Sequence, residues 1–187
     1  MLNKISSYII IKHQGGHPKF TAVIENHKNV FLSKGVHIGK ETTIRSRGRE
    51  ATIRIGSQTK IRDYVVIDAK KNILTISDYC YIARNCWIGG SGSIIIGTNS
   101  MVGLNSIIVS SDHNYLDIKK PYFDNSELEK PIAIGNNVWI GAGSIILGGS
   151  ALGSGSVVAA GTVVKGIFPE NSLIAGVPGK LKRTINR

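Results

Sequence analysis

The chain of 187 residues has the length of a single domain, and its 22 glycines indicate a fold rich in turns. Its formal net charge of +11 favours an anionic partner, but the basic residues are scattered and no nucleic-acid-binding motif accompanies them. These features argue against nucleic acid. No apolar run approaches the roughly 20 residues that a membrane-spanning helix needs.

The chain begins with MLNKISSYIIIKHQGG, which holds one lysine and a short apolar patch but no small-residue cleavage site. No signal peptide is therefore expected, and we expect a cytoplasmic protein. The lead-in, residues 1–37, reads as strands and loops.

From residue 38 onward, aliphatic residues return every six positions, which is the period of neither an α-helix nor a β-strand. The run IGNNVWIGAGSIILGGSALGSGSVVAAGTVV shows this most clearly, with anchors at Ile134, Ile140, Ile146, Leu152, Val158 and Val164. Less regular anchors precede it at Ile38, Ile44, Ile55, Ile61, Ile67, Ile76, Ile82, Ile88, Ile96, Val102 and Ile108.

Each hexad has its own turn position, three residues after the anchor. Residues that accept a positive φ cheaply occupy many of these positions. They are Asn99, Asn105, Asn137, Gly143, Gly149, Gly155 and Gly161, and the same position falls on Tyr79, Asn85 and Ser91. The next position is small or β-branched and points inward, so that Trp139, between Val138 and Ile140, points outward.

Three hexads make a coil of about 18 residues, and stacked coils would pair as parallel strands around a triangular core. The sequence therefore predicts an all-β fold, a parallel β-helix of hexapeptide repeats with six readable turns. Cys80 and Cys86 fall on inward positions and are expected to be buried, unpaired thiols rather than metal ligands or a redox pair.

A long insertion interrupts the repeat, because 38 residues separate Ile96 from Ile134 where one coil needs about 18. We expect a single domain, residues 1–187, with the β-helix over 38–175, an inserted loop over 110–131 and a basic tail over 176–187. Insertions of this length in a compact repeat are more often functional than not.

The insertion, SSDHNYLDIKKPYFDNSELEKP, carries His113, the only histidine beyond residue 37. Spacing alone leaves two interpretations open, an exposed loop histidine and a general base that takes a proton near neutral pH. Asp112 is a candidate to orient the imidazole, although adjacent residues of an extended chain point opposite ways. A triad with Ser110 or Ser111 lacks the required nucleophile elbow.

The run IGNNVWIGAGSIILGGSALGSGSVVAAGTVVKGIFPENSLIAGVPGKLKR, preceded by a loop that bears a histidine, resembles the hexapeptide-repeat acyltransferases. It is most similar to the sugar and polysaccharide O-acetyltransferases of maltose, galactoside and nodulation type, and to those of capsule and O-antigen clusters. The resemblance implies a left-handed β-helix, a homotrimer with active sites between subunits, acetyl-CoA as the donor and no metal.

The same resemblance assigns roles to individual residues. His113 matches the catalytic base, and Trp139 matches a tryptophan that walls the thioester end of the cleft. Ala142 and Ala160 match positions whose backbone groups bind the pantetheine arm.

Three basic residues match cofactor contacts, Lys165 near the far end of the cofactor and Lys180 and Arg183 near its nucleotide phosphates. Asn85 matches a residue near the acceptor, although it also occupies a left-handed turn position, which would explain it without any role in binding.

The expected activity is acetyl transfer from acetyl-CoA to a hydroxyl of a sugar or polysaccharide. N-acetylation of a nucleotide-linked amino sugar is the alternative, and a non-enzymatic β-helix scaffold is a remote one. Zinc chemistry would need three convergent histidines, and the histidines other than His113 lie far upstream, at His13, His17, His27 and His37.

The lead-in, residues 1–37, differs from the helical leader of the maltose and galactoside group. Peripheral contact of the protein with membrane-linked glycan precursors stays open.

Overall fold

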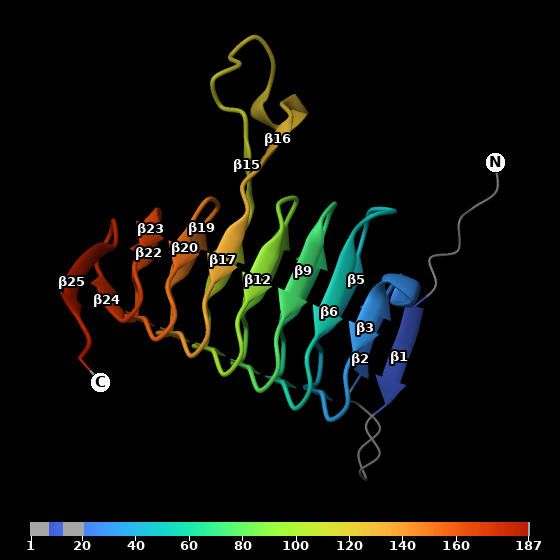
Figure 1. Cartoon of the computed structure of the whole chain (residues 1–187). Helices are drawn as coiled ribbons and strands as arrows, with labels where there is room; N and C mark the ends of the chain where they lie inside the picture. The colour runs from blue at the N-terminus through green and yellow to red at the C-terminus, as the bar shows by residue number, and fades with distance from the viewer. Residues whose placement is uncertain (1–7, 13–20, 187) are drawn as a thin grey trace.

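The computed structural model describes residues 8–12 and 21–186, and within them the chain winds into a parallel β-helix (Figure 1). The all-β fold predicted from the hexapeptide repeat is confirmed. The helices in this part of the chain are two short 3₁₀ turns, η1 (His27–Asn29) and η2 (Tyr122–Asp124), and none is long and apolar enough to cross a bilayer. The expectations for residues 1–7 and 13–20, which include His13, His17 and most of the start examined for a signal peptide, lie outside the described residues.

Three sheets form the faces of the prism. Sheet A contains β1 (Tyr8–Lys12), β2 (Thr21–Glu25), β5 (Thr43–Ser46), β8 (Val66–Ala69), β11 (Trp87–Gly90), β14 (Ile107–Val109), β19 (Ile145–Leu147) and β22 (Val163–Val164). Sheet B contains β3 (Val30–Leu32), β6 (Thr52–Ile55), β9 (Ile73–Ile76), β12 (Ile94–Ile96), β17 (Ile132–Ile134), β20 (Ala151–Leu152) and β23 (Ile167–Phe168). Sheet C contains β4 (His37–Ile38), β7 (Lys60–Ile61), β10 (Tyr81–Ile82), β13 (Met101–Val102), β18 (Trp139–Ile140), β21 (Val157–Val158), β24 (Ser172–Ala175) and β25 (Lys180–Thr184).

Each coil visits the sheets in the order B, C, A, and equivalent strands of successive coils pair in parallel. The helix makes about seven turns, one more than the anchors indicate, because a first coil starts at β3 and a last one adds β23 and β24. The chain then reverses, and β25 pairs antiparallel with β24. This reversal covers a sheet edge that would otherwise expose unpaired backbone groups.

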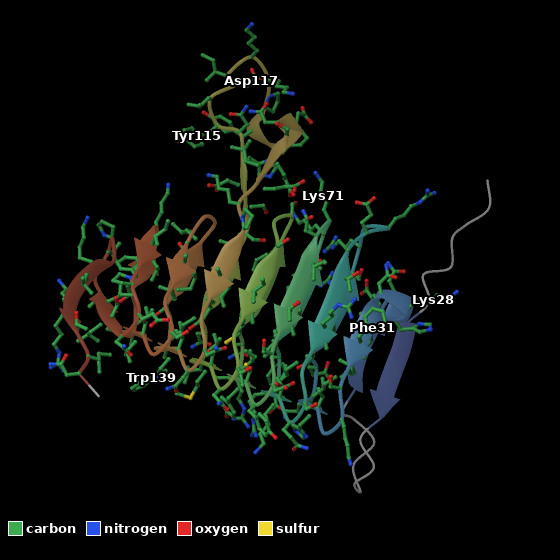
Figure 2. All side chains as sticks on the ribbon, in the orientation of Figure 1. Lys28, Phe31, Lys71, Tyr115, Asp117 and Trp139 are labelled. Carbon is green, nitrogen blue, oxygen red and sulfur yellow. The ribbon has the colours of Figure 1, made fainter. Side chains whose placement is uncertain are left out.

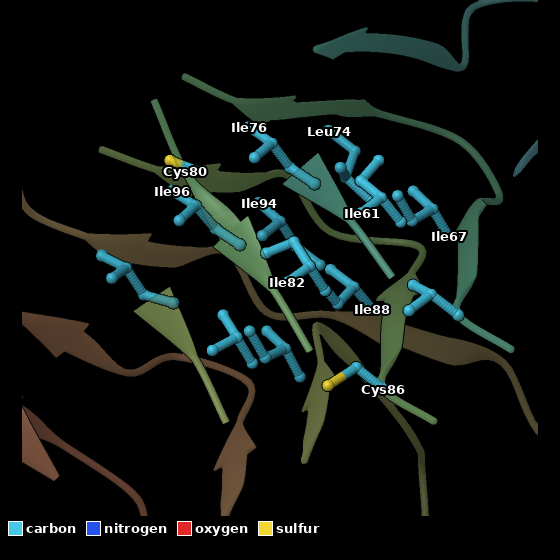
Figure 3. Close-up of a cluster of buried hydrophobic side chains, with 14 of the residues drawn as sticks. Ile61, Ile67, Leu74, Ile76, Cys80, Ile82, Cys86, Ile88, Ile94 and Ile96 are labelled. Carbon is cyan, nitrogen blue, oxygen red and sulfur yellow. The ribbon is translucent and has the colours of Figure 1, made fainter. Parts of the chain in front are cut away.

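The core is a stack of aliphatic side chains, and the anchors from Ile38 to Val164 are all buried (Figure 3). Most residues four positions after the anchors are buried too, and several of their hydroxyls donate to backbone carbonyls, as Ser100 Oγ does to Gly135 O at 2.9 Å. Cys80 and Cys86 are buried free thiols, as predicted, and burial raises the pKa of both.

The left-handed turn positions are also as predicted, with one exception. Positive φ values occur at Asn99, Asn105, Asn137, Tyr79, Asn85, Gly143, Gly149, Gly155 and Gly161. The prediction for Ser91 is wrong, because the left-handed residue at that corner is Gly90, with φ 122°. Ser91 is instead buried, and its hydroxyl donates to Glu127 in the insertion.

The insertion is a hairpin that projects from the corner where sheet A passes to sheet B (Figure 1). Its strands, β15 (Ser111–His113) and β16 (Glu127–Glu129), pair antiparallel, with His113 opposite Glu127. The expected interruption over 110–131 is therefore present between β14 and β17, and its tip lies outside the prism.

Candidate functional site

His113 ends the first strand of the hairpin, and its ring is exposed. Its Nδ1 lies 3.4 Å from the backbone oxygen of Asn125. Because a carbonyl can only accept, a hydrogen bond at this contact requires the tautomer with its proton on Nδ1, in which Nε2 is the lone-pair acceptor. A neutral imidazole with a free, exposed Nε2 is the form that can take a proton from a substrate.

Asn125 holds the loop that carries this contact, and its side chain is almost completely buried. Its Nδ2 donates to the backbone oxygens of Asn114, at 2.6 Å, and Asp117, at 2.8 Å. The residue thus fixes both sides of the loop beyond His113. No sequence pattern pointed to Asn125, since asparagines in loops are common and the partners are backbone groups.

Ionic contacts anchor the base of the hairpin to the second and third coils. Glu127 accepts hydrogen bonds from Lys70 and Ser91, and Glu129 accepts from Lys71 at 3.2 Å and Asn72 at 2.8 Å. Desolvation raises the pKa of Glu127, but the hydrogen bonds from Lys70 and Ser91 outweigh it, so the net pKa lies below its ordinary value.

Asp112 does not orient His113 in this structure. Its carboxylate pairs with Lys130, with 2.8 Å between Oδ2 and Nζ, and successive residues of β15 face opposite ways. Ser110 is buried, and its hydroxyl donates to the carbonyl oxygens of Gly89 and Gly92. His113 is thus the exposed imidazole of the hairpin, and the hydroxyl of Ser110 is bonded away from it.

Trp139 lies on the outer face of sheet C, with about half of its surface exposed, as its place in the repeat predicts. Parallel register places Met101 on one side of it and Val157 on the other. Leu173 follows Val157, and Arg183 in β25 lies opposite Leu173. Trp139 and Arg183 thus point from the same face, three strand spacings or about 14 Å apart.

Lys180 belongs to the same face as Arg183, because it lies opposite Ala175 in the β24–β25 pair. Both basic side chains are exposed. Lys165 is elsewhere, in the turn between β22 and β23, at the corner between sheets A and B from which the hairpin also projects. The structure therefore brings two of the three predicted phosphate contacts together and places the third at a different corner.

Ala142 and Ala160 occupy the same turn position on successive coils, just beyond sheet C. Within the described residues, neither backbone N–H donates to a protein acceptor, whereas the next residues do, with Gly143 N bonding Leu104 O and Gly161 N bonding Ala142 O. The N–H groups of Ala142 and Ala160 are donors that suit a carbonyl or an oxyanion.

Asn85 is exposed in the equivalent corner two coils earlier, with φ 58° and its backbone N–H bonded to Asp63 O at 3.2 Å. Its side chain makes no hydrogen bond within the described part of the chain. The backbone of Asn85 can therefore form the turn while its side chain binds a ligand.

The predicted residues form two groups on different sides of the prism. Trp139 lies on the side of the ribbon opposite the hairpin, whose outer part is marked by Tyr115 and Asp117 (Figure 2). In a triangular coil, the corner between sheets A and B faces away from sheet C. One chain therefore does not bring His113 to Trp139. Within residues 8–12 and 21–186, no group of three His, Cys, Asp or Glu side chains is placed to hold a metal ion.

Comparison with protein families identifies the repeat. The model described as bacterial transferase hexapeptide (six repeats) matches residues 131–166. This part of the chain is similar to the hexapeptide repeats of bacterial transferases. The matched repeats contain Trp139, Ala142, Ala160 and Lys165, whereas His113 lies in the insertion that precedes them.

Two curated relatives show how far the likeness to this family extends. The "Probable acetyltransferase Rv3034c" of Mycobacterium tuberculosis is 31% identical over 152 residues, which are 81% of this chain and 49% of the relative. WbbJ of Escherichia coli, named for O-acetyl transfer in lipopolysaccharide biosynthesis, is 32% identical over 62% of this chain and 63% of its own length. The matched part is thus about half to two thirds of each relative.

Among solved structures, a mutant of AntD, an N-acyltransferase from Bacillus cereus in complex with dTDP and coenzyme A, superposes with a TM-score of 0.68. The match covers 83% of this chain and 84% of AntD at 22% identity. At that identity the likeness shows that the two proteins share the fold of hexapeptide-repeat transferases.

Proposed function

We propose that this protein is an acetyltransferase that moves an acetyl group from acetyl-CoA to a hydroxyl of a sugar or polysaccharide. The observation that carries the proposal is the exposed imidazole of His113, with its Nδ1 directed to the Asn125 carbonyl and its Nε2 free. The names of the curated relatives support acetyl transfer, and WbbJ supports a glycan hydroxyl as acceptor. Because acetyl-CoA is a cytoplasmic metabolite, the proposal places the reaction in the cytoplasm.

The reaction is a direct transfer. Nε2 of His113 takes the proton of the acceptor hydroxyl as its oxygen attacks the thioester carbonyl, and a tetrahedral oxyanion forms. The N–H of Ala142 donates to that oxyanion, and one such donor is worth about 3 kcal/mol. When the C–S bond breaks, the imidazolium returns its proton to the departing CoA thiolate.

The donor lies along sheet C in this proposal. Trp139 walls the thioester end, and the N–H groups of Ala142 and Ala160 bind the pantetheine arm. Lys180 and Arg183, about 14 Å farther along the face, meet the nucleotide phosphates through charge-assisted hydrogen bonds. Asn85, on the other side of Trp139, is left for the acceptor.

The active site lies between chains of a homotrimer. His113 and Lys165 share the corner between sheets A and B, whereas the other proposed contacts lie on sheet C or at the corner after it. A cleft that holds both groups needs the hairpin corner of one chain against sheet C of the next. Three copies related by a three-fold axis supply three such clefts with one kind of contact.

Replacing His113 with alanine tests the assignment. The imidazole is exposed and anchors nothing, so His113→Ala should keep the fold and the affinity for acetyl-CoA while kcat falls about 10²- to 10⁴-fold. Acetyl-CoA binding by calorimetry and CoA release with a glycan acceptor are the two measurements. A variant that turns over at the wild-type rate would remove His113 from its role.

An amine acceptor is the second candidate, because an amino group would use the same base and the same donor site. AntD, which shares the fold, is named as an N-acyltransferase and was solved with a nucleotide. An assay that offers nucleotide-linked amino sugars beside hydroxyl acceptors separates the two reactions by the position of the acetyl group in the product.

A further inference from the structure

The outer face of sheet C continues past Trp139 toward the N-terminal coils. Strand register places Met101 next to Trp139, then Tyr81, then Lys60. All four side chains lie at equivalent positions on neighbouring strands and therefore share one face. Tyr81 is about 10 Å from Trp139, and Lys60 about 14 Å, as two and three strand spacings require.

Two cavities flank Tyr81 on this face. One, of about 270 Å³, is lined by Arg62, Tyr81, Ala83, Arg84 and Leu104. The other, of about 350 Å³, is lined by Gln58, Lys60, Tyr79, Cys80 and Tyr81. Neither lining contains an aspartate or glutamate, so the charged residues that line both cavities are all cationic. Tyr81 belongs to both linings and lies between the two cavities.

The basic side chains that line these cavities differ in their ion pairing from those around the hairpin. At the hairpin side Lys70, Lys71 and Lys130 each pair with a carboxylate. By contrast, the side chains of Lys60 and Arg62 make no hydrogen bond or ion pair with any residue in the described part of the chain.

Arg84 is the third cation at this end of the face, and it is only partly neutralised. It pairs with Asp63, with 3.2 Å between Nε and Oδ2, while 60% of its side chain stays exposed. Positive charge without an internal partner therefore lies next to the proposed acceptor end of sheet C.

We propose that the acceptor is an anionic sugar whose carboxylate or phosphate binds Lys60 and Arg62, while its ring lies against Tyr81. The inference rests on the proposed function, because Trp139 and the donor fix which end of the face receives the acceptor. An arginine with a free guanidinium can bind a carboxylate or phosphate through two hydrogen bonds, and a lysine adds a point charge.

Matched acceptors test this assignment. The wild-type protein is assayed with acetyl-CoA and an oligomer of sialic or uronic acid, and with the same oligomer after its carboxylates are reduced to alcohols. A nucleotide-linked sugar and the corresponding free sugar form the second pair. We expect kcat/KM at least about tenfold higher for the anionic member of one pair, and the pair that shows it identifies carboxylate or diphosphate as the anion.

Charge-removing variants locate the effect. Lys60→Gln and Arg62→Gln should each lower kcat/KM for the preferred anionic acceptor about tenfold, leave its neutral counterpart unchanged, and keep the affinity for acetyl-CoA. Lys28→Gln is the matched control, because it removes the same charge from an exposed site in η1 at the N-terminal end. Binding of the anionic oligomer to the wild-type protein, followed by calorimetry without acetyl-CoA, does not depend on how the variants fold.

The two proposals fail in different ways. Equal kcat/KM for both members of each pair, with acetyl-CoA bound and acetyl transferred, overturns the anionic acceptor and leaves the acetyltransferase intact. Equal losses in Lys28→Gln and Arg62→Gln would also overturn it, since a general charge effect would then account for the result. A protein that binds no acetyl-CoA overturns the proposed function and this inference with it.

Discussion

Asn125 determines the orientation of His113 although it lies 12 residues away in sequence. Its carbonyl accepts from Nδ1, and its own side chain holds the loop through the carbonyls of Asn114 and Asp117. An imidazole that acts as a base needs both the correct tautomer and a fixed direction. At the residue scale, the candidate base is thus a histidine together with the loop that holds it.

Asn125→Asp removes the Nδ2 donor and keeps the shape of the side chain, so the carbonyls of Asn114 and Asp117 lose their partner. We expect kcat to fall about tenfold to a hundredfold, while the KM for acetyl-CoA and the thermal midpoint of the β-helix stay close to wild type. A purely structural role would instead lower the thermal midpoint and leave kcat per folded protein unchanged. Steady-state kinetics and thermal unfolding of the same samples distinguish the two results.

At the scale of elements, the coils contain glycine at two kinds of position, for two different physical reasons. A Cβ on Gly141 would lie 2.6 Å from the backbone nitrogen of Ala160 in the next coil, whereas one on Gly143 would meet nothing within 4 Å. Gly143 has a φ of 65°, and Asn105 and Asn137 fill the same turn position with similar angles. The first position is thus restricted by coil stacking and the second by backbone conformation alone.

Gly141→Ala should therefore destabilise the protein by about 1–3 kcal/mol, because backbone must move to admit the methyl group. Gly143→Asn should change the free energy of unfolding by less than about 0.5 kcal/mol, because asparagine tolerates the left-handed region. Denaturant unfolding of both variants checks the contrast. A larger loss for Gly143→Asn than for Gly141→Ala would contradict it.

The hairpin is an element with its own pH dependence. The pKa of Glu127 is lowered in the folded protein, so its contribution to stability is complete above its ordinary value of 4.5 and is lost as pH falls below that value through the lowered folded pKa. We expect amide exchange in β15 and β16 to accelerate over that acid range before the coils open. Glu127→Gln should exchange faster near neutral pH and lose this acid-dependent step, and an unchanged step would assign the effect to another carboxylate.

The hexad pattern predicts the coils well because one local rule, a left-handed residue three positions after the anchor, repeats at most corners of the prism. It fails at Ser91, where the corner is longer and Gly90 takes the positive φ. It also misses β3 of the first coil, which precedes the anchors Ile38 and Ile44, and the last coil, which adds β23 and β24. The site is less predictable, since the partners of His113 and Glu127 are 12 to 57 residues distant and one of them is a backbone carbonyl.

At the scale of the whole molecule, the separation of His113 from Trp139 has a direct consequence for assembly. Each proposed site uses the hairpin of one chain and sheet C of another, so a chain damaged in the hairpin still offers an intact sheet C. Two inactive variants with damage on different sides should therefore complement each other when their chains are mixed.

His113→Ala and Ala160→Trp form such a pair, because the first removes the base and the second fills the proposed pantetheine site with an indole. When the two are unfolded together in equal amounts and reassembled, random mixing gives about one site in four with an intact hairpin and an intact face, so about a quarter of wild-type activity should return. Each variant reassembled alone is the control and should stay inactive. If the mixture shows no activity although size measurements show mixed assemblies, the site lies within a single chain, and the proposed cleft between subunits is wrong.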